Sequence, residues 1–217
     1  MYINKYWGNY IGDTDDSLNL VAFLEEQKKE EIPLREIFAK IGLDKQNWDF
    51  HQTVKYLEFT HSNGVEIDFH FAIDLVTDLA AILLECSVSG SVNLHDLDSY
   101  NTPARRIRVT ATPEEHDAMN KALADFVQDP LSYDLHDLVD DEDIEEMARL
   151  VEELRKELYE AAGRNRSFHV KAEDMKNLLP DWEGAEGCIA TNRIMVEGCK
   201  VGYCYREKPD GDWDSGW

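Results

Sequence analysis

The stretch from Tyr56 to Leu97 constrains the fold most, because it combines a tight turn with two different hydrophobic periods. Residues 57–60 lead into the sequence His-Ser-Asn-Gly at 61–64, and Asn-Gly is a strong hairpin signal. Apolar and polar residues alternate over 65–71, as in a half-exposed strand. Apolar residues then recur at helical spacing over 72–84 and occupy almost every face. The stretch therefore predicts a β-hairpin followed by a buried helix at the core of the larger domain.

Shorter patterns on either side predict further elements. The aromatic-rich segment Tyr2–Ile11 predicts a strand, and Ser17 is a candidate N-cap for a helix that follows it. Pro33 and Gly42 flank a second short helix, and residues 105–111 alternate as a strand. A capping box at 112–115 and an amphipathic pattern over 141–162 predict two longer helices. Residues 1–165 are thus expected to form an α+β domain, with helices packed on a mainly antiparallel sheet.

The character of the sequence changes after residue 163. Gly-Arg-Asn-Arg-Ser at 163–167 is the best candidate for a linker, and short β-like runs with glycine turns follow it. Residues 166–217 are therefore predicted to form a second, small β-rich domain. The sequence leaves open whether this second domain is complete.

The charge of the chain limits its partners. Its 217 residues include 45 acids and 22 lysines and arginines, for a net charge of −23. Such a charge argues against nucleic acid and against anionic membranes, both of which require basic surface, and favours a basic protein partner. The alternative is an acidic surface that only keeps the protein soluble. The longest apolar run, 79–84, is too short to span a bilayer, and the first residues lack a signal peptide, so a cytoplasmic location is expected.

The predicted hairpin carries the best metal-like arrangement in the sequence. Glu66, Asp68 and His70 alternate along one face of its second strand, and carboxylates with an imidazole suit a divalent ion. The alternative is simply the solvent-facing side of a half-buried hairpin. Nucleophile elbows, phosphate loops, zinc-binding helices and dinucleotide fingerprints are absent from the sequence, so no catalytic residue and no cofactor is predicted.

Acidic residues are unusually dense before and within the start of the predicted helix at 141–162. They are Asp134, Asp137, Asp140, Asp141, Glu142, Asp143, Glu145 and Glu146. This cluster predicts a docking surface for a basic partner, or alternatively an exposed helix start whose charges favour the helix dipole. A second set of candidate contacts lies in the C-terminal segment, where aromatic side chains could anchor an interface. Its members are Tyr203, Tyr205, Trp213, Asp214 and Trp217.

The C-terminal segment also resembles a known family. It contains Cys-Ile at 188–189, Asn-Arg at 192–193, Gly-Cys-Lys-Val-Gly-Tyr at 198–203 and Asp-Ser-Gly-Trp at 214–217. This pattern resembles the immunity-protein thirty-three family, a domain of unknown function found in polymorphic-toxin loci of bacteria. The resemblance implies a protein that binds and neutralises a cognate toxin. Residues 1–165 resemble the N-terminal part of uncharacterised bacterial proteins that carry the same tail.

The sequence thus favours a non-catalytic acidic binding protein, an immunity protein that neutralises a basic bacterial toxin such as a nuclease. Two alternatives stay open. One is a metal-dependent enzyme or metal-binding protein that uses the Glu66, Asp68 and His70 face. The other is a regulatory interaction module whose partner is not a toxin.

Overall fold

A computed structural model describes residues 2–99 and 102–165 of the chain. The chain divides into two units, Met1–Asn165 and Arg166–Trp217, and the first is described here by itself. The predicted β-rich domain and its candidate contact residues lie outside the described residues. Over the described residues, no helix combines the length and the apolar composition needed to cross a membrane.

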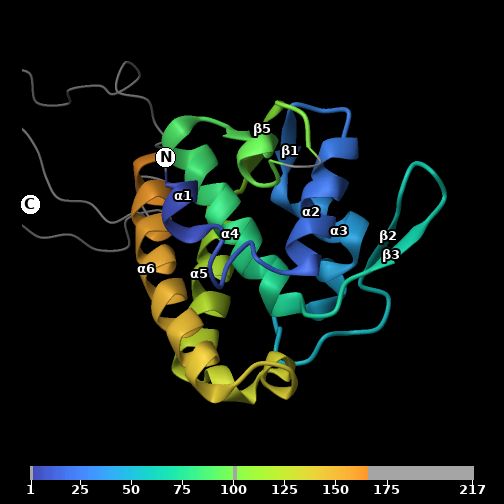
Figure 1. The fold of residues 1–217 in the computed structure, drawn as a ribbon. Helices are drawn as coiled ribbons and strands as arrows, with labels where there is room; N and C mark the ends of the chain where they lie inside the picture. Colours follow the sequence, from blue (N-terminus) through green and yellow to red (C-terminus); the bar gives the residue numbers. More distant parts are fainter. Residues whose placement is uncertain (1, 100–101, 166–217) are drawn as a thin grey trace, which may run out of the picture. The chain divides into compact units, whose positions relative to one another are not determined.

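Helix α4 (Ala72–Ser89) runs through the centre of the first unit (Figure 1). Every residue from Ala72 to Cys86 is buried, the polar ones included. Helices α1 (Ile3–Tyr6), α2 (Asp15–Glu26), α5 (Pro113–Gln128) and α6 (Asp141–Asn165) all contact it. The prediction of a buried helix after the hairpin is therefore confirmed, and its apolar residues on all faces are explained by neighbours on every side.

The strands form two small sheets. In the first, β5 (Arg106–Thr110) lies between β1 (Glu31–Pro33), which runs parallel to it, and β4 (Val92–Asn93), which runs antiparallel. The second is the predicted hairpin of β2 (Glu58–Thr60) and β3 (Glu66–Asp68), which projects from the helices in Figure 1. Two of these three strand pairings are antiparallel, and the α+β class is confirmed.

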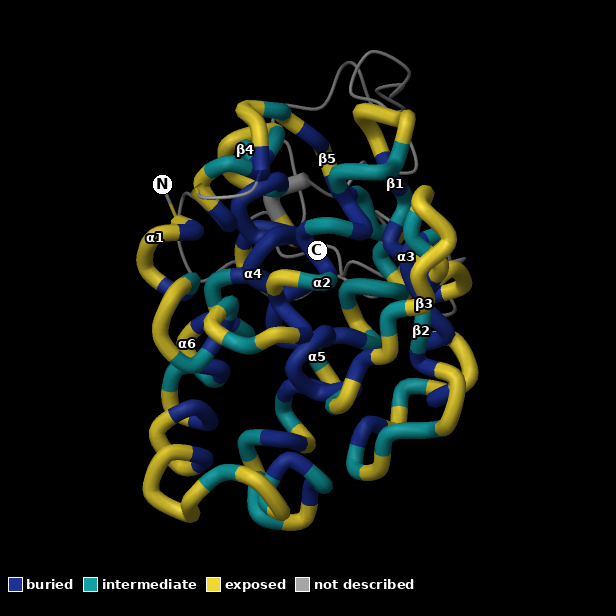
Figure 2. The backbone as a smooth tube through the Cα atoms, turned by 45° about the vertical axis from the view of Figure 1, so that its right-hand side comes forward, coloured by how far each residue is buried: buried dark blue, intermediate teal, exposed yellow. Residues whose placement is uncertain are grey.

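Short elements complete the unit. They are α3 (Leu34–Ile41) and the 3-10 helices η1 (Leu43–Gln46), η2 (Leu94–Asp96), η3 (Pro130–Ser132) and η4 (Asp134–Asp137). Gly42 ends α3 with a φ of 85°, and a Cβ there would lie 2.6 Å from the carbonyl oxygen of Tyr56. Glycine is therefore required at this helix end, as the sequence predicts. Figure 2 shows α4 buried over most of its length, whereas the outer side of α6 is exposed.

The N-terminal segment differs from its prediction. Tyr2–Ile11 is not a strand: it contains the four-residue helix α1 and an isolated bridge between Trp7 and Ile11. The backbone N–H of Ile3 donates to Glu85 Oε2 at 2.9 Å, and this distant acceptor stabilises a helix that has no local cap. The N-cap of α2 is Thr14, not Ser17, whose own N–H donates to the Thr14 hydroxyl at 3.1 Å.

Arg105, just before β5, binds the C-terminal end of α2. Its guanidinium donates to the carbonyl oxygens of Glu25 and Gln27 and, at 3.0 Å, to that of Lys29. Helix ends leave carbonyls without helical partners, and a planar guanidinium with several donors can satisfy three at once. This residue therefore connects the start of the sheet to the first long helix.

The hydrogen bonds between Arg105 and the end of α2 predict different effects for substitutions of two nearby arginines. Arg105→Ala should lower the free energy of unfolding by about 2 kcal/mol or more, because hydrogen bonds to charged groups contribute roughly 1.5–3 kcal/mol each. Arg108→Ala should cost less than about 0.5 kcal/mol, because the ion pair of Arg108 among the described residues is an exposed one with Glu31 at 3.6 Å. Urea unfolding of both variants measures the difference. Equal losses in the free energy of unfolding would contradict a stabilising role for the contacts between Arg105 and the end of α2.

Candidate functional site

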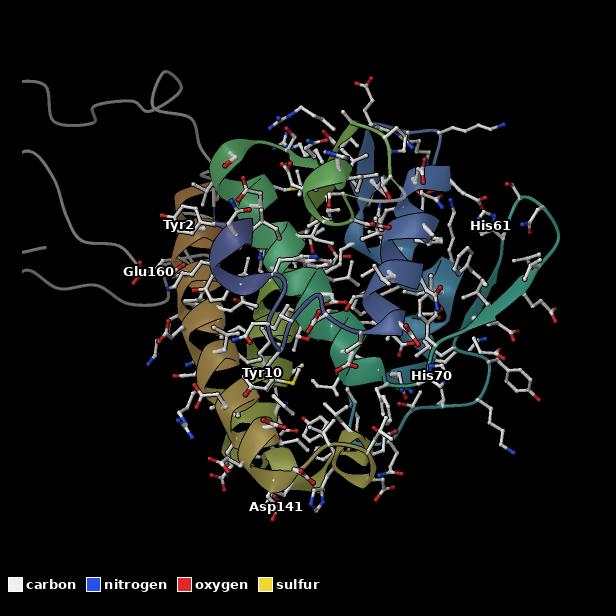
Figure 3. All side chains as sticks on the ribbon, viewed as in Figure 1. Tyr2, Tyr10, His61, His70, Asp141 and Glu160 are labelled. Atoms are coloured by element: carbon white, nitrogen blue, oxygen red, sulfur yellow. The ribbon has the colours of Figure 1, made fainter. Side chains whose placement is uncertain are left out.

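The predicted acidic cluster forms one continuous end of the first unit, which we call the acidic end and define as residues 134–146. Eight of these thirteen residues are aspartate or glutamate, and the segment has neither lysine nor arginine. It consists of η4, a short connection and the first turns of α6. Figure 3 places Asp141 at this end of α6 and Glu160 at the opposite end.

The acidic end is fixed to the body of the domain through Asp134. The Asp134 backbone N–H donates to the carbonyl of His51 at 2.8 Å, and its carboxylate accepts from the N–H of Thr53 at 2.6 Å. Next to it, Tyr133 is buried and stacks on the His51 ring, with the ring centroids 4.3 Å apart. Asp134 therefore faces the protein and positions the surface, so it is the member of the predicted cluster least available to a partner.

The other seven acids of the cluster are exposed. They are Asp137, Asp140, Asp141, Glu142, Asp143, Glu145 and Glu146. Several contacts orient them without removing their charge: His136 Nε2 lies 2.8 Å from Asp141 Oδ1, and the Tyr10 hydroxyl donates to Asp143 at 3.1 Å. The Asp143 carboxylate raises the pKa of Tyr10, so this phenol stays protonated. His136, Tyr10 and the start of α6 thus orient these exposed acids along the surface.

Basic residues are distributed unevenly along α6. Toward its C-terminal half, Glu152 pairs with Arg155 at 2.6 Å, and Glu157 pairs with Lys5 at 2.9 Å. The hydrogen bond from Arg155 is the main cause that lowers the pKa of Glu152 to about 2. At the acidic end, the one ion pair to lysine or arginine in the described part of the chain joins Arg149 to Glu146. The negative potential of α6 is therefore concentrated at its N-terminal end.

An exposed apolar side chain lies within this acidic surface. Leu138 is 75% exposed, more than any other large hydrophobic residue among those that the structure describes. An apolar side chain surrounded by charges resembles the anchor of a protein interface, where a few buried side chains supply most of the binding energy. Leu138 was not predicted as a contact residue, although the Leu-Val pair at 138–139 interrupts the acidic run in the sequence.

The hairpin residues predicted as metal ligands are not brought together as a set. Glu66 and Asp68 are exposed on β3, whereas His70 is turned to the buried Asp16, with its Nδ1 3.0 Å from Asp16 Oδ1. The Asp16 carboxylate also accepts the backbone N–H groups of His70 and Phe71 at 2.8 and 2.9 Å. Within residues 2–99 and 102–165, no group of three histidines, cysteines or carboxylates is placed to hold a metal ion.

A second set of acids lies inside the domain, on α4. Asp74, Asp78 and Glu85 are each 5% exposed or less. The Asp78 carboxylate accepts the N–H of Gly12 at 2.8 Å, as Glu85 accepts that of Ile3. Burial is the main cause that raises the pKa of Asp74 to about 8 and that of Asp78 to about 7, and neighbouring acids add to the shift of Asp74. Asp78 and Glu85 thus bind backbone N–H groups inside the fold, and none of these three acids is exposed to a partner.

The described residues form an acidic α+β unit. At its acidic end, carboxylates are closely spaced and mostly lack a lysine or arginine partner among the described residues. Residues 2–158 match the family model described as immunity protein 68, and because this match covers more than half of the chain, the chain belongs to that family. Residues 188–217 match a second model, the immunity protein Imm33 domain, which confirms the resemblance seen in the C-terminal sequence. Comparison with curated proteins and with solved structures gave no match.

The buried acids predict how stability changes with pH. The pKa of Asp74 rises from 3.8 to about 8 on folding, so the folded protein holds a proton that the unfolded chain has lost. Its contribution to stability is present at low pH and is lost as the pH rises through this window. The melting temperature of Asp74→Asn should exceed that of the native protein by an amount that grows up to about pH 8 and then levels off.

The matched control for this measurement is Asp68→Asn, because Asp68 is exposed on the hairpin. Its melting temperature should follow that of the native protein at every pH. A constant difference between Asp74→Asn and the native protein across the same range would refute the assignment of the pH dependence to Asp74.

Proposed function

We propose that this chain is a non-catalytic immunity protein that neutralises a basic toxin by binding it through the acidic end. Two family matches, both to immunity proteins, support a toxin-neutralising role. The observation that carries the choice of surface is the concentration of seven exposed acids at 137–146, with a single pair to an arginine among the described residues. A basic toxin would meet this surface first, because opposite potentials steer two proteins together before they touch.

The acidic end suits a toxin whose own active surface is positive. An enzyme that cleaves nucleic acid needs basic residues to hold phosphates. An acidic immunity protein would cover those residues and exclude the substrate without any chemistry of its own. The same charge opposes binding of this chain to nucleic acid or to anionic membrane. The proposal places the protein in the cytoplasm, where it would protect the cell that makes it.

Leu138 gives this electrostatic surface an apolar anchor. Charges in the rim of an interface mainly increase the association rate, whereas a buried side chain near the centre mainly slows dissociation. Leu138 is exposed in the free protein, and its burial against a partner would remove an apolar side chain from water. In the proposed interface, the acids therefore increase the association rate, and Leu138 slows dissociation.

Charge reversal tests the surface. Asp137→Lys/Glu142→Lys should slow association with a cognate basic toxin by about ten-fold or more at low salt, because steering contributes about 10–1,000-fold. The effect should shrink as salt screens the charges. Stopped-flow mixing at several salt concentrations measures the rates, and survival of cells that express the toxin measures protection.

The matched control is Glu66→Lys/Glu160→Lys, which makes the same change in net charge at exposed positions on the hairpin and at the far end of α6. This control should retain most of the association rate. If both double variants slow association equally, only net charge matters and the acidic end is not the contact surface.

Substitution of Leu138 tests the anchor. Leu138→Ser should raise the dissociation rate about ten-fold or more, while the melting temperature of the free protein stays nearly unchanged because the side chain is 75% exposed. Val88→Ser, at a 45% exposed position on α4, is the control and should leave binding unchanged. An unaltered dissociation rate for Leu138→Ser would remove Leu138 from the interface.

A further inference from the structure

An open groove lies beside the acidic end, between the end of α5 with η3 on one side and α6 on the other. Its volume is about 620 Å³. The apolar residues that line it are Val127, Pro130, Leu131 and Ala148, and the charged ones are Asp129, Glu145, Arg149, Glu152 and Glu153. The volume falls within the range of pockets that enclose small ligands, so the groove can hold one large side chain and the backbone beside it.

The path of the chain explains why the groove is there. Helix α5 ends at Gln128, and Pro130 begins η3 because proline cannot continue the preceding helix. The 3-10 helix η3 replaces a further turn of α5 and packs beside α6. Across the opening, α6 presents Ala148, whose side chain is too small to fill the space. Val127 and Leu131 are only partly buried as a result, and they leave an apolar floor facing water.

The rim of the groove is negative on balance, because four of its five charged residues are acids and the fifth, Arg149, is paired with Glu146. Glu152 is already paired with Arg155 and Lys156, and Glu153 lies 3.2 Å from Lys5. Among the described contacts, the side chains of Asp129 and Glu145 have no lysine or arginine partner. Glu145 belongs to both the rim and the acidic end, so the groove is continuous with the proposed interface.

We infer that this groove receives a segment of the partner in which a large apolar side chain is flanked by lysine or arginine. The inference rests on the proposed function and adds the chemistry that would be recognised. The apolar floor favours an aliphatic or aromatic side chain that leaves water. Asp129 and Glu145 bind the flanking cations, and the same carboxylates repel an acidic segment.

Short peptides test the groove without knowledge of the toxin. The probe is the blocked peptide Lys-Lys-Leu-Lys-Lys, added to the full chain labelled with nitrogen-15 and followed by two-dimensional NMR. It should shift the amide signals of Val127, Leu131 and Ala148. Its affinity should exceed that of Lys-Lys-Ser-Lys-Lys by about ten-fold or more, because only leucine can bury apolar area on the floor. Glu-Glu-Leu-Glu-Glu should not bind.

Two variants and one control separate the parts of the groove. Glu145→Lys should weaken the leucine peptide several-fold by reversing a rim charge, and Leu131→Gln should remove its advantage over the serine peptide. Glu160→Lys, at an exposed position on the same helix far from the groove, should leave both affinities unchanged. The melting temperature of each variant checks that it is folded.

Three outcomes would overturn the inference. They are equal affinities for the leucine and serine peptides, signal shifts confined to 137–143, and an absence of binding by the leucine peptide. Shifts at the groove that appear on raising the protein concentration alone would instead assign it to a second copy of this chain. Failure here is distinguishable from failure of the proposed function, because the Asp137→Lys/Glu142→Lys variant lies outside the groove and tests neutralisation of the toxin independently.

Discussion

Buried carboxylates on and beside α4 hold the rest of the first unit to its central helix. Asp78 accepts the N–H of Gly12, Glu85 accepts that of Ile3, and Asp16 accepts those of the two residues that lead into α4. A buried N–H without an acceptor is costly, and a buried carboxylate is costly unless it is hydrogen-bonded, so each group requires the other. The N-terminal segment has no long helix or sheet of its own before α2, and these bonds determine where it lies. An apolar helix of the same shape would bury as much area without specifying this arrangement.

The parts of the fold that the sequence predicts are those whose cause is local. The capping box of Thr112 and Glu115, the helix end at Gly42 and the apolar faces of α4 each depend on residues within a few positions, and all three are found. The segment Tyr2–Ile11 was predicted wrongly because its conformation depends on Glu85, 82 residues away from Ile3. Likewise, nothing near Asp134 in the sequence indicates that its carboxylate turns inward to Thr53. The acidic end could be located from the composition of the sequence. The exposure of Leu138 and the groove beside it could not, because both depend on the packing of η3, η4 and α6.

Charge placement carries more functional information here than total charge. A net charge of −23 is compatible with a protein that is merely soluble. The structure distinguishes three groups among the acids: buried ones that bind backbone, those of the later part of α6 that pair with Lys5, Arg155 and Lys156, and those of the acidic end. The last group has little internal compensation, and an exposed leucine and an apolar groove lie within and beside it. In the proposed function, this is the surface that would meet a toxin.

The crowding of carboxylates at the start of α6 also affects the protein when it is alone. Like charges at neighbouring positions repel one another, and the four acids at 140–143 are consecutive in the sequence. Dissolved cations that gather at this end reduce the repulsion, so salt stabilises the free protein there. A cationic partner would displace those ions into solution and take over their role at fixed positions. Salt therefore acts in opposite directions on the two states, since it stabilises the unbound acidic end and weakens its attraction to a partner.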